Sequence, residues 1–143
     1  MGLDMYLNAK RFLWHGEEAL GEDLAHHFPE LKGRRVKELI VEAMYWRKAN
    51  AIHAWFVKHC QEGEDDCGNY HVGREQLEEL RQLILEALAN KDASKLPPQG
   101  GFFFGNTDIN DWYWEDLRST EAGLARCLEE FTHSWEFEYH SSW

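Results

Sequence analysis

The segment from Arg74 to Asn90 has the clearest periodicity in the chain and predicts an amphipathic helix. Its apolar residues recur every three or four positions and form one stripe: Leu77, Leu80, Leu83, Ile84, Ala87 and Leu88. The opposite face is acidic and polar. A helix with one apolar face must bury that face, so this segment requires a sheet or further helices beside it.

Strands and two further helices are predicted around this helix. Alternation of apolar and polar residues indicates the first and last strands, and β-branched and aromatic residues favour a second, although its acids also tolerate a helix. The expected strands lie at residues 3–8, 35–47, 67–72 and 135–140, and the expected helices at 48–61, 74–90 and 110–131. We therefore expect an α+β fold, with a mostly antiparallel sheet of about four strands and about three helices packed on one face. At 143 residues, the chain should form one globular domain spanning 1–143.

Two segments are expected to lack long regular elements. Residues 16–33 read as a loop with one short helix, because they combine a proline, several acids and two glycines at the ends. Phe102, Phe103 and Phe104 stand between glycines and are too few for anything but an extended piece. An edge strand that fills the core is favoured over a lid that covers a ligand.

Charge and composition exclude several classes of partner. The formal net charge of −11 argues against binding to a nucleic-acid backbone, which requires a basic face. No apolar stretch approaches the roughly 20 residues that span a bilayer, and the first residues do not resemble a secretory signal. Three cysteines without a disulfide framework suit a reducing cytosol. We expect a cytoplasmic protein that binds neither membrane nor nucleic-acid backbone.

The expected junction between the second strand and the following helix is the main candidate site. It gathers aromatic, cationic, amide and imidazole side chains: Tyr45, Trp46, Arg47, Lys48, Asn50 and His53. Residues three apart share a helix face, and free amides at a helix N-terminus attract anions. An anionic group would then bind Arg47 and Lys48 while Trp46 or Tyr45 stacks on a flat ring. The alternative is that the aromatic residues, with Trp55 and Phe56, simply fill the core.

Asp4 and Tyr6 lie on one side of the first expected strand. They would close over the same pocket if the first two strands are neighbours. The alternative is that they form the solvent-facing side of an amphipathic strand.

Metal and covalent chemistry find little support in the sequence. The cysteines and histidines near residues 59–71 lack the paired spacing of a zinc site, so we expect no metal and no cofactor. The chain has no Gly-x-Ser-x-Gly motif. General acid–base catalysis by His53 with Asp4 remains the one enzymatic alternative, and a non-enzymatic protein is favoured.

Four motifs together carry a resemblance to a known family. They are MGLDMYL at residues 1–7, YWRKANAIH at 45–53, DCG at 66–68 and GFFFG at 101–105. In these motifs the chain resembles a family of small proteins of phages and prophage-bearing bacteria. The family has no settled activity, so the resemblance implies a phage or prophage context and assigns no catalytic residues.

These observations lead to one expected function and two alternatives. We expect a non-enzymatic phage or prophage accessory protein that binds a small anionic or aromatic, nucleotide-like ligand in the bacterial cytosol. The first alternative is an acidic protein–protein module that inhibits a host protein, motivated by Asp111–Trp112–Tyr113–Trp114. The second is a hydrolase that uses His53 and Asp4. Trp143 at the C-terminus indicates a docked last strand, with docking across a homodimer as one option.

Overall fold

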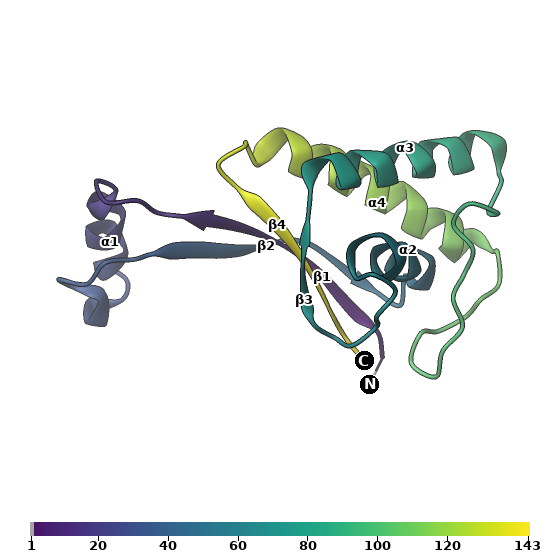
Figure 1. Cartoon of the computed structure of the whole chain (residues 1–143), viewed down its shortest axis with the longest axis horizontal. Helices are drawn as coiled ribbons and strands as arrows, with labels where there is room; N and C mark the ends of the chain where they lie inside the picture. Colours follow the sequence, from purple (N-terminus) through teal and green to yellow (C-terminus); the bar gives the residue numbers. More distant parts are fainter. Residues whose placement is uncertain (1) are drawn as a thin grey trace.

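The computed structural model describes residues 2–143 and contains one four-stranded antiparallel sheet with helices on one side (Figure 1). The strands are β1 (Asp4–Phe12), β2 (Glu38–Arg47), β3 (Asn69–Val72) and β4 (Glu136–Ser142). The helices are α1 (Glu18–Ala25), α2 (Asn50–Cys60), α3 (Arg74–Asn90) and α4 (Asp111–Glu130), with a 3₁₀ turn, η1, at Pro29–Leu31. The predicted α+β class and antiparallel sheet are confirmed.

The sheet order is β2-β1-β4-β3, so β1 and β4 are central and β2 and β3 form the edges. Asp4 pairs with Arg47 and Phe12 with Glu38 along the whole length of β1 and β2. A β-bulge interrupts this register: Leu7 faces Met44 while Asn8 faces Glu42, which leaves Ala43 as an extra residue on β2.

The core lies between the sheet and three helices. Alternate residues of β1 point into it and are fully buried: Leu3, Met5, Leu7 and Ala9, with Leu3 just before the strand. Helices α2, α3 and α4 cover this face with their own apolar stripes, including Leu77, Leu80 and Ile84 of α3. These are the three helices expected on one face. Asn110 accepts a hydrogen bond from the backbone N–H of Tyr113 and caps α4.

The fourth helix, α1, lies away from this core at the end of a projecting hairpin (Figure 1). Strand β4 pairs with β1 only from Asp4 to Lys10, so Arg11 and Phe12 are paired with β2 alone. We call residues 11–39 the arm. Its tip contains α1 and η1, which contact one another. The loop predicted at residues 16–33 therefore contains one short helix, as expected, and the arm itself was not foreseen.

The prediction of an extended strand at residues 102–104 is wrong. The three phenylalanines form a turn closed by a bond from the N–H of Phe104 to the carbonyl of Gly101. Phe102 is 94% exposed, whereas Phe104 is buried beside the ring of His53. The turn docks on the start of the chain because the N–H of Leu3 donates to the carbonyl of Phe103.

Candidate functional site

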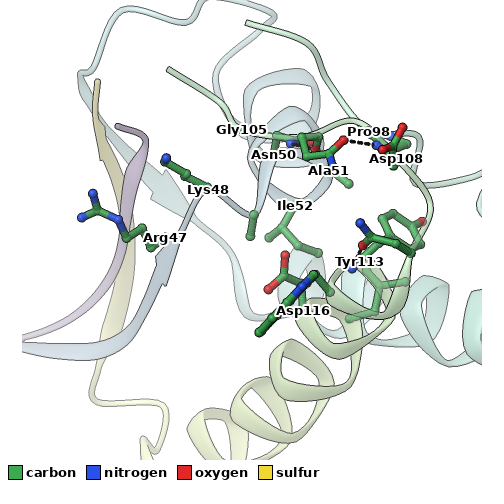
Figure 2. Close-up of a pocket in the computed structure, with 15 residues that line it drawn as sticks. Arg47, Lys48, Asn50, Ala51, Ile52, Pro98, Gly105, Asp108, Tyr113 and Asp116 are labelled. Carbon is green, nitrogen blue, oxygen red and sulfur yellow. Dashed lines mark hydrogen bonds between the residues drawn. The ribbon is translucent and has the colours of Figure 1, made fainter. Parts of the chain in front are cut away.

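A hollow of about 230 Å³ opens where β2 passes into α2 (Figure 2). Its walls come from this junction, from the loop at residues 98–110 and from the first turns of α4. Ile52 and Leu117 supply apolar wall, and Asn106, Asp108 and Asp116 supply polar groups. Three of the predicted site residues line it: Arg47, Lys48 and Asn50.

Lys48 is held at the rim of the hollow by its backbone and by two glycines. Its φ of +57° is left-handed, which is unfavourable for a residue with a side chain and occurs often at functional sites. The N–H of Lys48 donates to the carbonyl of Leu3. A Cβ on Gly2 would lie 2.9 Å from its Cε, and one on Gly105 would lie 3.3 Å from its Cβ and Cδ. The lysine stem thus runs between two positions that glycine leaves open.

The ammonium of Lys48 makes no ion pair or hydrogen bond with any residue in 2–143. Arg47 differs, because its guanidinium lies 3.3 Å from the Asp4 carboxylate. In Figure 2 both side chains extend away from the hollow, so their charges lie at its outer rim. Lys48 is the cation that is left available to a ligand there.

Asp116 places a carboxyl group at the floor of the hollow (Figure 2). Burial, with a smaller contribution from Glu115, raises the pKa of Asp116 to about 6. A carboxyl group in a cleft with a raised pKa is a candidate for function. Asp116 was not among the residues predicted from the sequence. The available signal was its position on α4, next to the buried Leu117 and three residues after Tyr113.

Asn50 has a positioning role, because its amide is used within the protein. The side-chain nitrogen donates to the carbonyls of Phe104 and Asn106 at 3.0 Å, and the oxygen accepts from the N–H of Gln99 at 2.9 Å. The buried amide thus fixes both ends of the loop that walls the hollow. It is not free to bind a ligand as the sequence analysis expected.

Trp46 and His53 belong to the core. Trp46 is 6% exposed, and its indole N–H donates to the hydroxyl of Thr120 at 2.8 Å. His53 is 1% exposed; Nδ1 lies 2.6 Å from the Tyr139 hydroxyl and Nε2 lies 2.8 Å from the Asp65 carboxylate. Both ring nitrogens are therefore occupied, and neither residue offers the stacking or hydrogen-bonding surface that was predicted.

The buried network around His53 extends to the C-terminus. Burial raises the pKa of Tyr139 well above its usual value, so this phenol keeps its proton. The other oxygen of Asp65 accepts from the indole N–H of Trp143 at 3.0 Å. Trp143, which suggested a docked last strand, is thus held by a contact within its own chain.

Asp4, Tyr6 and Tyr45 lie on the face of the sheet opposite the helices. Asp4 accepts a hydrogen bond from the Tyr45 hydroxyl. The ring of Tyr6 lies 5.4 Å from that of Tyr45 and 6.0 Å from that of His140. The pairing of His53 with Asp4 proposed for a hydrolase is wrong, because the sheet separates them and each has other partners.

No group of three or more His, Cys, Asp and Glu side chains in residues 2–143 is arranged to hold a metal ion. None of the helices in the same range is long and apolar enough to cross a membrane.

Comparisons with protein-family models, with curated proteins and with solved structures each found no match to this chain. The resemblance to phage and prophage proteins therefore stays a prediction, and a functional assignment must come from the geometry.

Proposed function

We propose that the protein binds a small ligand that carries an anionic group and a planar ring, with the ring in the hollow and the anion at its rim. The observation that carries this proposal is the ammonium of Lys48, which pairs with no residue in the described range 2–143 and is held in a left-handed backbone conformation beside the hollow. The setting we propose is the cytoplasm of a bacterium that carries the phage or prophage.

The size of the hollow limits which part of the ligand it can enclose. Pockets for drug-sized ligands measure about 300–1,000 Å³, and this one measures about 230 Å³. A single ring system fits that volume better than a whole nucleotide does. A phosphate would remain outside, within reach of the exposed Lys48 and Arg47.

The chemistry of the walls suits a nucleoside phosphate. Trp112 is 78% exposed at the edge of the hollow and offers an indole on which a base can stack. Asp108 and Asp116 can accept hydrogen bonds from the N–H or O–H groups of a base or sugar. Binding without turnover is favoured because His53, the imidazole considered for acid–base catalysis, has both nitrogens engaged in the core.

Titration calorimetry with mono-, di- and cyclic nucleotides tests the proposal. We expect Lys48→Ala to weaken the binding of a phosphate-bearing ligand at least tenfold, the loss of about one charge-assisted contact. Lys91→Ala is the matched control, because Lys91 is also exposed and left-handed, with φ +47°, but lies at the end of α3. Absence of binding by every nucleotide at millimolar concentration, or equal loss in both variants, contradicts the proposal.

The second candidate function is binding of a host protein at the same end of the molecule. Trp112 and Phe102 are 78% and 94% exposed, and exposed aromatic residues often anchor protein interfaces. If this candidate is right, Trp112→Ala abolishes capture of one host protein, whereas Lys48→Ala leaves it unchanged.

A further inference from the structure

Strand β2 is an unusually long and unprotected edge. It has ten residues, and in the described part of the chain, residues 2–143, it pairs with β1 on one side only. The other edge strand, β3, has four residues. Natural proteins protect such edges with prolines, charged side chains, bulges or short strands. Strand β2 has no proline or lysine; it contains the bulge at Ala43 and three charged residues, of which Glu38 and Arg47 lie at its ends and Glu42 near its middle.

Apolar side chains are exposed along this edge and on the arm that continues it. Ile40 is 57% exposed, Val41 39% and Tyr45 46%. On the arm, Phe12 is 48% exposed and Trp14 72%. This surface is continuous with the open strand, so one partner could cover both the backbone groups and the apolar side chains.

We propose that β2 pairs antiparallel with β2 of a second copy of this chain, around a two-fold axis between Glu42 and Ala43. Such a contact is isologous: where residue i of the first copy contacts residue j of the second, residue j of the first also contacts residue i of the second. In this register Glu38 faces Arg47 of the second copy, and Ile40 faces Tyr45. The pairing thus places opposite charges at both ends and apolar residues next to them, while Glu42 lies beside the axis opposite Ala43.

The bulge makes this register consistent with the pleat of the strands. Phe12 pairs with Glu38, Lys10 with Ile40, Tyr6 with Tyr45 and Asp4 with Arg47, all on the face opposite the helices. In a regular strand, residues 40 and 45 would point to opposite faces. The extra residue at Ala43 brings both onto one face, so the two copies can form a continuous sheet with matching faces.

The arm is much less acidic than the rest of the chain, so its charge complements that of a second copy. Residues 11–39 contain five Lys or Arg and six Asp or Glu, a net charge of −1, whereas the whole chain carries −11. Within the arm, Lys32, Arg34, Arg35 and Lys37 follow one another without an acid between them. The side chains of Lys32, Arg34 and Lys37 make no ion pair with any residue in 2–143.

Antiparallel pairing sends this basic segment toward the acidic start of α4 in the second copy. Residues before Glu38 of one copy continue past Arg47 of the other, and the four residues 34–37, which lie outside helix and turn, span up to about 14 Å. Beyond Arg47 lies the hollow, which exposed Asp108 lines, and α4 adds the exposed acids Asp111 and Glu115 in its first turns. The proposed dimer therefore pairs the two β2 edges and also brings the basic segment of each arm toward the acidic start of α4 in the other copy.

Sedimentation velocity of the full chain without ligand tests the pairing independently of nucleotide binding. We expect a dimer of about twice 16.9 kDa at about 100 µM, in exchange with monomer on dilution. Ile40→Lys should weaken dimerisation at least tenfold, because a lysine on an edge strand opposes pairing. Phe102→Lys is the control: it makes the same kind of change at a 94% exposed residue outside β2 and should leave the dimer intact.

Charge reversal gives a sharper test of the register. E38R alone and R47E alone each place like charges opposite one another and should be monomeric. An equal mixture of the two variants restores an attractive pair at both ends and should form a heterodimer. A monomeric wild-type protein, insensitivity to Ile40→Lys, or failure of the mixture to associate overturns the proposal; in the first case a strand of a different protein becomes the occupant to seek.

Discussion

The region around the hollow and the arm differ in whether their polar and aromatic side chains are buried or exposed. Asn50 at the hollow, and Trp46 and His53 in the core near it, are buried and hydrogen-bonded within the fold. On the arm, Trp14 and Phe12 are exposed and contact mainly one another, with ring centroids 4.8 Å apart. Residues that suggest chemistry in the sequence, such as Asn50 and His53, can therefore have a structural role. Apolar residues such as Phe12 and Trp14 can instead lie exposed, where a partner could contact them.

The largest expected effect concerns the buried histidine. His53→Ala leaves a cavity and strands the hydroxyl of Tyr139 and the carboxylate of Asp65, so we expect the free energy of unfolding to fall by about 3–4 kcal/mol. Urea denaturation measures this. His59→Ala, which removes an exposed ring stacked on Trp55, should cost less than about 1 kcal/mol. An equal loss of unfolding free energy in the two variants would contradict the structural role assigned to the buried His53.

Asn50→Ala should lower the free energy of unfolding of the protein by about 2–3 kcal/mol, because it leaves the Phe104 and Asn106 carbonyls and the Gln99 N–H without their partner. The loop at residues 99–106 should also exchange its amide protons faster, while the amides of α3 keep their relative protection. Unchanged exchange in this loop would contradict the positioning role assigned to Asn50.

A smaller, pH-dependent effect is expected at Asp116. Folding raises its pKa from 3.8 to about 6, so between these pH values the folded state binds more protons and stability falls as pH rises. Asp116→Asn should remove this fall and stabilise the protein at pH 7 by about 1–2 kcal/mol, a value that allows for partial solvent screening. Thermal unfolding at pH 4 and pH 7 compares the two proteins. A variant with an unchanged pH profile would show that this carboxyl is well solvated.

The smallest effect is expected on the arm. Trp14→Ala should change the unfolding free energy of the monomer by about 0.5 kcal/mol or less, because the indole is 72% exposed. Denaturation at a low protein concentration, where the monomer dominates, measures this. A loss above about 1 kcal/mol would mean that the arm packs as part of the core.

The sequence predicted the regular elements well where the pattern was local. The stripe from Leu77 to Ala87 placed α3 at its observed bounds, and alternation around Met5 and around Phe137 placed two strands. The arm escaped prediction because its length depends on where β4 stops pairing with β1. That limit is set by residues far apart in the chain.

The candidate site was predicted only in part, for a physical reason. Spacing places Asn50 and His53 on neighbouring positions of one helix but does not say which part of the helix faces the core. Packing of α2 on the sheet buries both side chains. Arg47 stays outside because it ends β2 beside Asp4 on the outer face of the sheet, and Lys48 because it lies in the connection before the helix starts. Asp116 comes from a helix more than sixty residues later.

Nuclear magnetic resonance titration with a nucleoside monophosphate tests the central claim most directly, because it observes both regions at once. We expect chemical-shift changes at Lys48, Gly105 and the Trp112 indole, with the Trp14 indole on the arm unchanged. Changes confined to Trp14 and the arm, or none at the hollow at millimolar nucleotide, would contradict it.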